Sequence, residues 1–429
     1  MTASAAHPPR DVYIAGQSSV SGWGGGIALT LSLQEAFAAD GQTTLVLGVN
    51  DRAGSEPELA PEITRLDVPS GVSRRLWRVR NWFLPHRLAR SLRKLPPPAR
   101  AFVTVSPTLV PAAKRAWPDV PVVFVFACLL NNCLPFTWER RVRPSFWAGV
   151  DFSGIRRAEQ LALALADAIL TPTQQARDEI LAFHPAARER VVVYRGGFEP
   201  SDVSRVERAA YRRELGVNDE AVVFMIAGVC DRNKAVDLAV RALPSVDTRG
   251  HLVIVGDGPE LASLGSLAAE QHVARRVHIL GQKPDVGPWH AAADCVVSTS
   301  WYDSFPTTIK EAMSRGRPVL VPRHSAPEVY AGMAEVIAND GGGLLYNRML
   351  PGGLAAAMNR MIRNPQLREE LGARARQVAD ERSGYRGIVD HTRRVGGLPP
   401  ATPQPDTEPA TSDEACVPSP QGVVAWSEP

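Results

Sequence analysis

Short apolar segments rich in valine and isoleucine alternate with helical segments along most of this chain, and the alternation restricts the fold more than any other feature. A strand, a helix and a second strand in succession are typical of parallel sheets, because the helix carries the chain back to the starting edge. The pattern runs through the first half and restarts at 221–228. The sequence therefore predicts an α/β protein with two Rossmann-like, doubly wound parallel-sheet domains facing a cleft. The expected strands are 11–16, 43–49, 100–106, 120–127, 167–173 and 190–197, then 221–228, 250–260 (ending in a glycine turn), 276–282, 294–300 and 317–322.

A length of 429 residues fits two such domains. Polar residues near 198–218 are expected to link them, and a Pro- and Thr-rich C-terminal stretch is expected to be disordered. The predicted divisions are a disordered N-terminus at 1–10, a first Rossmann-like domain at 11–200, a second Rossmann-like domain at 201–385, a C-terminal helix returning to the first domain at 386–398, and a disordered tail at 399–429.

Composition indicates the class of protein. The net charge of +3 is modest, so no nucleic-acid partner is expected. Five cysteines without a CxxC spacing favour a reducing cytoplasm over disulfides or structural zinc. The N-terminus lacks the apolar core of a signal peptide, and the longest apolar run, 120–130, is too short to span a bilayer.

Charge is uneven along the chain. Residues 68–118 contain no Asp or Glu but nine Arg and two Lys, and 74–94 interleaves Arg with Trp77, Trp82 and Phe83. We favour a solvated helix face with its aromatics in the core. The alternative is a basic amphipathic segment that contacts the inner membrane surface or an anionic acceptor.

The stretch WYDSFPTTIKEAMSRGRPVLVP, residues 301–322, brackets a tight turn with Asp303 and Glu311. A strand before it and a helix at 307–316 place it at the carboxyl edge of a parallel sheet, where ligands bind. A Thr is expected to cap the helix, Pro306 to suit its first turn, and the N–H groups of 307–309 to form an anion site. Flanking carboxylates would accept hydrogen bonds from hydroxyls, which suits a phosphate attached to a polyol. The alternative is a capped helix with Glu311 in a surface ion pair.

Three further glycine or basic motifs follow strands. GWGGG at 22–26 is able to form a phosphate nest, although the stretch does not match a nicotinamide fingerprint and a plain turn is the alternative. GVCDRNKAVDL at 228–238 puts Arg232 and Lys234 at a strand-to-helix turn, in a chain with five Lys and 43 Arg. An ammonium there suits a diphosphate, whereas a surface charge at a helix start is the alternative. VGDGPE at 255–260 is a weaker signal.

Together these stretches resemble glycosyltransferase family 4, retaining enzymes with the GT-B fold, over residues 11–396 and most strongly over 221–330. The resemblance implies that Glu311 holds the nucleotide ribose and Asp303 contacts hydroxyls of the transferred sugar. It also implies that Lys234 neutralises the leaving diphosphate with help from an arginine. The donor site is further expected to include Gly228, Gly258, Phe305, Pro306, Thr307 and Thr308, and the diphosphate and acceptor loop Gly24, Gly25 and Gly26.

Two departures from the family pattern change the expected site. Val229 stands where members commonly have Arg, so Arg232 is expected to serve instead. No His follows the strand at 120–127, where Cys128 and Asn131 become the candidate acceptor or sugar contacts. The missing His points to a different sugar or a weakened enzyme.

The sequence thus predicts a retaining, metal-independent, cytoplasmic hexosyltransferase that needs no cofactor. The donor is expected to be a UDP- or GDP-linked sugar, and the acceptor hydroxyl to belong to a small natural product, a lipid-linked sugar or a glycan. The alternatives are a glycoside phosphorylase or a sugar-nucleotide epimerase of the same fold, because fold does not determine chemistry. A non-catalytic sugar-nucleotide-binding protein is a further alternative.

Overall fold

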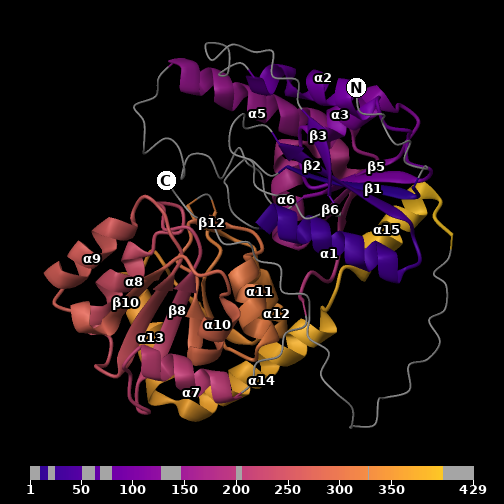
Figure 1. Cartoon of the computed structure of the whole chain (residues 1–429). Coiled ribbons are helices and arrows are strands. Elements are labelled where there is room, and N and C mark those ends of the chain that lie inside the picture. Colours follow the sequence, from indigo (N-terminus) through magenta and orange to yellow (C-terminus); the bar gives the residue numbers. More distant parts are fainter. Residues whose placement is uncertain are drawn as a thin grey trace, which may run out of the picture.

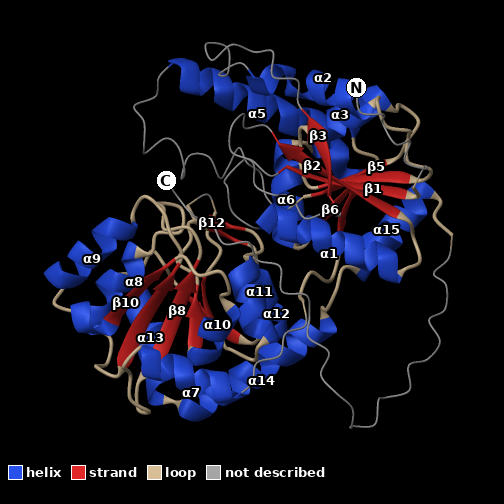
Figure 2. Ribbon diagram, viewed as in Figure 1, coloured by secondary structure: helices blue, strands red, loops and turns tan. Residues whose placement is uncertain are grey.

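Two α/β domains make up the protein in a computed structural model (Figure 1), which describes residues 10–17, 25–50, 63–67, 80–126, 146–199, 205–326 and 328–399. Each domain is a parallel sheet covered by helices on both faces (Figure 2). The expected pair of doubly wound sheets is therefore confirmed.

The N-terminal sheet has seven parallel strands in the order β3-β2-β1-β4-β5-β6-β7. Helices α2, α3 and α5 cover one face, while α1 and the C-terminal helix α15 cover the other. The strands are β1 Val12–Gln17, β2 Thr44–Asn50, β3 Ile63–Asp67, β4 Ala101–Thr104, β5 Val122–Val125, β6 Ala168–Thr171 and β7 Val191–Val193. The helices are α1 Gly25–Ala39, α2 Arg80–Leu92, α3 Leu109–Ala116, α5 Phe146–Leu165 and α6 Gln174–Phe183.

The C-terminal sheet has six parallel strands in the order β10-β9-β8-β11-β13-β15. Helices α8, α9 and α13 pack on one face and α7, α10, α11, α12 and α14 on the other. The strands are β8 Val222–Ala227, β9 Gly250–Val255, β10 Val277–Gly281, β11 Cys295–Val297, β13 Val319–Pro322 and β15 Gly343–Tyr346, beside a small sheet of β12 Tyr302–Asp303 and β14 Tyr330–Ala331. The helices are α7 Arg205–Glu214, α8 Asp237–Ala242, α9 Leu261–Glu270, α10 Gly287–Ala292, α11 Thr307–Ser314, α12 Met333–Asp340, α13 Gly353–Arg363, α14 Pro365–Glu381 and α15 Arg386–Gly396.

The strand order of the C-terminal sheet indicates at which edge a ligand would bind. In the C-terminal sheet the order reverses between β8 and β11, since β9 follows β8 outward in one direction and β13 follows β11 in the other. Ligands of doubly wound sheets bind beyond the carboxyl ends of the strands at such a reversal. The segments after β8 and β11 carry Lys234 and Asp303 respectively, so both residues lie at this edge of the sheet.

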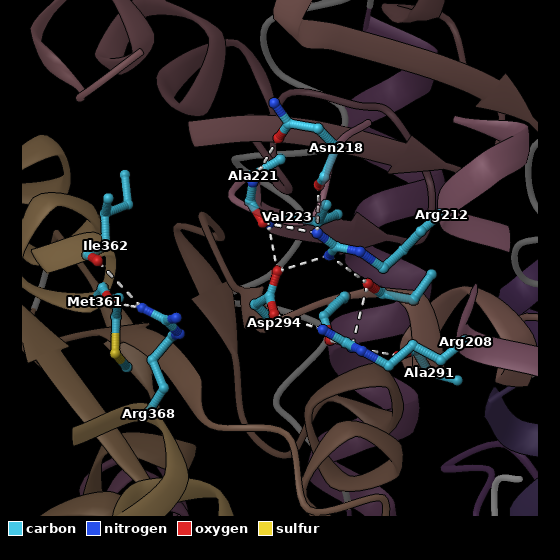
Figure 3. Close-up of polar contacts among 12 residues, drawn as sticks. Arg208, Arg212, Asn218, Ala221, Val223, Ala291, Asp294, Met361, Ile362 and Arg368 are labelled. Carbon is cyan, nitrogen blue, oxygen red and sulfur yellow. Dashed lines mark hydrogen bonds and ion pairs between the residues drawn. The ribbon is translucent and has the colours of Figure 1, made fainter. Parts of the chain in front are cut away.

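The stretch at 198–218, expected to be a polar linker, is partly helical. Residues 205–214 form α7, in which Tyr211 packs edge-on against Trp289 of α10 at 4.8 Å between ring centroids. Arg208 and Arg212 of α7 bond to Asp294 at 2.6 and 3.0 Å, as Figure 3 shows. The arginines in this segment led to the prediction that it is exposed to solvent. In the structure their charge is neutralised by Asp294, which lies more than 80 residues away in the chain.

The Asp294 cluster belongs to the scaffold. Asp294 also accepts a hydrogen bond from the Val223 N–H at 2.8 Å, and Arg212 donates to the carbonyls of Asn218 and Ala221 (Figure 3). These bonds hold the amino ends of β8 and β11 together, at the edge of the sheet opposite to the predicted site. A cavity of about 420 Å³ next to this cluster is lined by α7 and contains no predicted site residue.

The two domains share the C-terminal end of the chain. Ile388 and Val389 of α15 are buried in the same cluster as Val12 and Ile14 of β1, so α15 completes the N-terminal domain. Where the chain crosses, the Gly197 N–H donates to Gly384 O at 2.7 Å and the Gly384 N–H donates to Phe198 O at 2.8 Å. The outward and returning segments are therefore bonded to each other.

The basic segment is only partly described, because 74–79 lies outside the described residues and α2 begins at Arg80. Its apolar face, including Leu84, Leu88 and Leu92, is buried. Phe83 is 58% exposed, so the favoured interpretation, in which the aromatics enter the core, is wrong for this residue. Along the described ranges, no helix is long and apolar enough to cross a membrane.

Two glycines of the C-terminal domain give a matched test of the packing. Gly256 has φ +137°, and a Cβ there would lie 1.9 Å from the carbonyl oxygen of Gly228. Gly265 lies inside α9, where the nearest atom to an added Cβ is 3.8 Å away. We expect Gly256→Ala to lower the free energy of unfolding by at least about 3 kcal/mol through strain and overpacking. Gly265→Ala should raise it by roughly 0.5–1 kcal/mol.

Chemical denaturation of the two variants beside the wild type measures both effects. Equal midpoints for Gly256→Ala and the wild type would show that β8 and β9 do not approach as closely as described.

Candidate functional site

The predicted basic residue and the predicted acid meet at the carboxyl edge of the C-terminal sheet. The Lys234 ammonium forms an ion pair and hydrogen bond with Asp303 Oδ2. Their side chains are 31% and 17% exposed, so the pair lies mostly inside the protein but remains accessible. Such a pair leaves an ammonium able to turn toward an incoming anion, while the carboxylate remains as an acceptor for hydroxyl groups.

A buried amide that the sequence did not reveal aligns these two loops. Asn233 donates through Nδ2 to Tyr302 O at 2.9 Å and accepts from the Tyr302 N–H at 3.0 Å. The Trp301 N–H donates to Asn233 O at 2.8 Å. Thr299 Oγ1 adds a bond to Lys234 O at 2.7 Å. The two loops are therefore held side by side by hydrogen bonds to their backbones as well as by the Lys234–Asp303 pair.

The helix start at α11 differs in detail from the expectation. Pro306 is the N-cap residue, with extended backbone at φ −62° and ψ 126°, so it precedes the first turn, and no threonine side chain caps the helix. The Ile309 N–H is bonded to Pro306 O at 3.2 Å and is not free. Among the residues that the structure describes, the N–H groups of Thr307 and Thr308 have no partner. The expected anion site at this helix end would therefore use two N–H groups rather than three.

Glu311 lies one turn further along α11, and its side chain is 41% exposed. Burial raises the pKa of its carboxyl, against the opposing effect of Arg315 and Lys310. Its nearest basic neighbour is His290 of α10, with 3.8 Å between His290 Nδ1 and Glu311 Oε2. The alternative of a simple surface ion pair does not describe this carboxylate, because it faces a fully buried imidazole.

Lys310 and Phe305 face the junction between the domains. Lys310 Nζ donates to Gly197 O at 2.7 Å and lies 5.1 Å from the Phe305 ring centroid. Phe305 packs edge-on against Phe198 at 5.6 Å. The Phe305 side chain therefore packs at the domain junction, and only its backbone remains for the expected ligand contact.

The glycine turns after β8 and β9 lie against each other. A Cβ on Gly258 would lie 2.5 Å from the carbonyl oxygen of Cys230, and its φ of +154° also favours glycine. Arg232, expected to assist Lys234, has its Nε 3.5 Å from Glu260 Oε1 in the same turn. Gly228 ends β8, directly before the segment that carries Lys234.

Several predicted residues of the N-terminal domain are not placed. Gly24, Cys128 and Asn131 lie outside the described residues. Gly25 and Gly26 are the first residues of α1, so they belong to a helix start and not to the loop that the sequence indicated. The helix therefore begins two residues earlier than expected, since glycines are unfavourable in a helix interior but tolerated in its first turn.

Contacts between the domains form around the same loop. Tyr302 donates its hydroxyl to both carboxylate oxygens of Glu179 in α6, each at 2.9 Å. Its ring stacks on Tyr330 at 4.6 Å between centroids. Glu335 accepts hydrogen bonds from the N–H groups of Gln174 and Gln175 at 3.0 and 2.9 Å, which caps α6 from the other domain. The strand that carries Asp303 is thus attached to the N-terminal domain.

Both halves of the chain are similar to known glycosyltransferases. Residues 207–378 match the family described as "Glycosyl transferases group 1", and residues 24–197 match the "Glycosyl transferase 4-like domain". A D-inositol 3-phosphate glycosyltransferase of Streptomyces avermitilis is 29% identical over 241 residues, which are 52% of this chain and 50% of that protein. The chain spans between 50% and 63% of the length of such curated relatives.

Solved structures establish the arrangement of the domains. HepE of Anabaena in complex with UDP and glucose superposes with a TM-score of 0.67 at 19% identity, over 90% of this chain and 98% of that chain. WaaG, a glycosyltransferase involved in lipopolysaccharide biosynthesis, gives 0.67 at 18% identity, over 90% and 100%. At these identities the likeness establishes the fold alone, and the expected GT-B arrangement is confirmed.

The buried imidazole predicts a pH dependence of stability. Burial, with Arg315 and Arg317, lowers the pKa of His290 from 6.5 to about 3. Between these values the unfolded chain binds a proton that the folded protein does not bind. Stability is therefore complete above pH 6.5 and falls as the pH drops toward 3. We expect the wild type to lose about 1.5 kcal/mol more than His290→Asn between pH 6.5 and 5.

Denaturant titrations at several pH values give the two slopes. Thr308→Val is the matched control, since it removes a partner of the imidazole but keeps the buried base and should keep the steep slope. Parallel slopes for the wild type and His290→Asn would contradict this burial.

Proposed function

We propose that this chain is a glycosyltransferase of the family 4 type, which transfers a sugar from a nucleotide diphosphate sugar to an acceptor hydroxyl. The observation that carries the proposal is the grouping of Lys234, Asp303 and the α11 helix start at one sheet edge. A cation, two free N–H groups and two carboxylates within one loop system match a diphosphate joined to two polyols, the ribose and the sugar.

Each group has a separate role in the proposed reaction. Lys234 and the N–H groups of Thr307 and Thr308 would take the charge that develops on the diphosphate as the glycosidic bond breaks. Asp303 and Glu311 would accept hydrogen bonds from the sugar and the ribose, which positions the anomeric carbon. Lys234 must leave Asp303 or share it in order to reach the phosphate, so donor binding should rearrange their pair. Arg232 is the nearest further arginine in sequence and would help once its contact with Glu260 is exchanged.

We infer that the transfer retains the anomeric configuration and needs no cofactor or bound metal. In this mechanism the acceptor hydroxyl attacks from the face that the diphosphate leaves, and the leaving phosphate takes the proton. The two acids are assigned to hydroxyl binding, so neither serves as a nucleophile. UDP is the first nucleotide to test, because HepE was solved with UDP, while GDP remains the second choice.

The alternative functions differ in what they consume and release. A phosphorylase would release a sugar phosphate from a glycoside in inorganic phosphate, and an epimerase would convert one nucleotide sugar into another without an acceptor. A binding protein would hold the donor without transfer. The acceptor itself is left open between a small natural product, a lipid-linked sugar and a glycan.

Nucleotide titration tests the donor site directly. We expect one of UDP, GDP and ADP to bind the wild type, with the affinity reduced at least about tenfold in Lys234→Ala and in Glu311→Ala, because each removes a charged hydrogen-bond partner. Isothermal calorimetry measures all three proteins. Lys94→Ala is the control, because Lys94 is exposed on the N-terminal domain. If no nucleotide binds the wild type, the proposed site is wrong.

Stereochemistry and metal dependence test the reaction itself. With the matching α-linked donor and an active acceptor, proton NMR of the first product should show an α-linkage, and excess EDTA should leave the rate unchanged. A β-linked first product would exclude retention, and loss of activity restored only by a divalent ion would exclude the metal-independent mechanism.

We also propose that α2 contacts an anionic membrane surface. Phe83 is exposed and lies on the same helix as the exposed Arg90, with the exposed Arg93 directly after it. Vesicles of phosphatidylglycerol, but not of phosphatidylcholine, should sediment the protein, and high salt should release it. Binding should fall several-fold in Phe83→Ser/Arg90→Ser but not in Arg360→Ser. If this double variant sediments like the wild type, α2 is not the contact.

A further inference from the structure

The imidazole of His290 lies between two residues assigned to the donor site, yet nothing in the sequence motif points to it. Its side chain is fully buried between α10 and α11. His290 Nε2 is 3.1 Å from Thr308 Oγ1, in the turn that begins α11. His290 Nδ1 is buried without a hydrogen-bond partner and lies 3.8 Å from Glu311 Oε2. The imidazole therefore spans the distance between the helix-start anion site and the carboxylate.

Electrostatics determine which nitrogen carries the proton. The guanidinium groups of Arg315 and Arg317, together with burial, keep the imidazole neutral at neutral pH. A neutral imidazole has one N–H and one lone pair. A lone pair on Nδ1 would face the Glu311 carboxylate and repel it, whereas an Nδ1–H would be attracted. The Thr308 hydroxyl is able to donate to Nε2, which completes the tautomer with the hydrogen on Nδ1.

Movement of Glu311 by about 1 Å would convert the 3.8 Å separation into a hydrogen bond of ordinary length. The carboxylate is partly exposed and sits at the end of a flexible side chain, so this movement is easy. Two hydroxyls of a bound ribose would occupy the outward lone pairs of the carboxylate and orient it. The unpartnered Nδ1 then gains its partner only when a ligand is bound.

We propose that His290 is a positioning residue for the donor site, whose Nδ1–H orients Glu311 toward the nucleotide while its Nε2 fixes the Thr308 hydroxyl. The proposal rests on the function proposed above, because it assigns Glu311 to the nucleotide. His290 touches neither the substrate nor the reacting atoms, and it acts through the two residues that do. If His290 had a purely structural role, an apolar ring of similar volume could replace it. The neighbouring Trp289 already packs α10 against Tyr211 of α7.

Three substitutions separate the two nitrogens. His290→Asn keeps an amide N–H near the Nδ1 position, His290→Gln places its amide near Nε2, and His290→Phe keeps only the ring. We expect the nucleotide identified by calorimetry to bind His290→Asn within about threefold of the wild type, and the Gln and Phe variants about tenfold more weakly. In a Glu311→Ala background, His290→Phe should add less than about twofold, because the interaction has already been lost.

Equal losses in both backgrounds would overturn the proposal and leave a packing role. The same conclusion would follow if His290→Phe lowered the melting temperature but left the affinity unchanged.

Side-chain NMR tests the tautomer without any variant that risks misfolding. In ¹⁵N-labelled wild type at pH 7, long-range ¹H–¹⁵N correlations should show His290 with a protonated Nδ1. Addition of UDP, GDP or ADP, whichever binds, should shift the Nδ1 resonance, and exposed His272 should not change.

The outcomes of the NMR experiment distinguish the two proposals. A protonated Nε2 in the free protein overturns the role of His290 even where a nucleotide binds. Absence of binding by all three nucleotides overturns the proposed function, whichever tautomer is found. Binding without a shift at Nδ1 leaves the donor site in place and removes His290 from it.

Discussion

The paired amide contact of Asn233 with the backbone of Tyr302 is the interaction on which the site depends. It joins the segment after β8 to the segment after β11, and these come from strands that are neighbours in space but about 70 residues apart in the chain. An amide side chain satisfies one N–H and one C=O at once, so the register of the two loops is defined to within one residue. Lys234 follows Asn233 and Asp303 follows Tyr302, and their pairing is a consequence of that register.

The loop that carries Asp303 has a second attachment, to the other domain. Tyr302 bonds to Glu179 and stacks on Tyr330, while Glu335 caps α6. Tyr302 therefore links the N-terminal domain to the strand that carries Asp303. The segment that carries Asp303 is thus bonded both to the segment that carries Lys234 and to the N-terminal domain.

Structure that depends on neighbouring residues in the chain could be predicted from the sequence. Contacts between residues far apart in the chain could not. Most strands followed from runs of β-branched residues, although β3 and β15 were not predicted. Lys234, Asp303 and Glu311 were singled out because they lie at fixed offsets from strand ends. Asn233 and His290 were missed because a single amide or imidazole in an ordinary helix-start sequence has no pattern of its own. The helix α7 was mistaken for a linker because its arginines are neutralised by Asp294, which is distant in the chain. Pro306 was placed one residue too far into α11, an error of the size expected at helix ends.

The return of α15 to the first sheet has a consequence for the order in which this protein is made. Residues of β1 and the turns of α15 that cover it are separated by more than 370 positions, and Tyr385, Ile388 and Val389 bury the face that holds Val12 and Ile14. A ribosome releases the whole N-terminal sheet long before it releases that cover. The second domain has its own core, formed without α15, whereas the part of the first sheet that α15 covers stays exposed to water until α15 packs on it. The N-terminal half is thus the last to be finished, although it is the first to be synthesised.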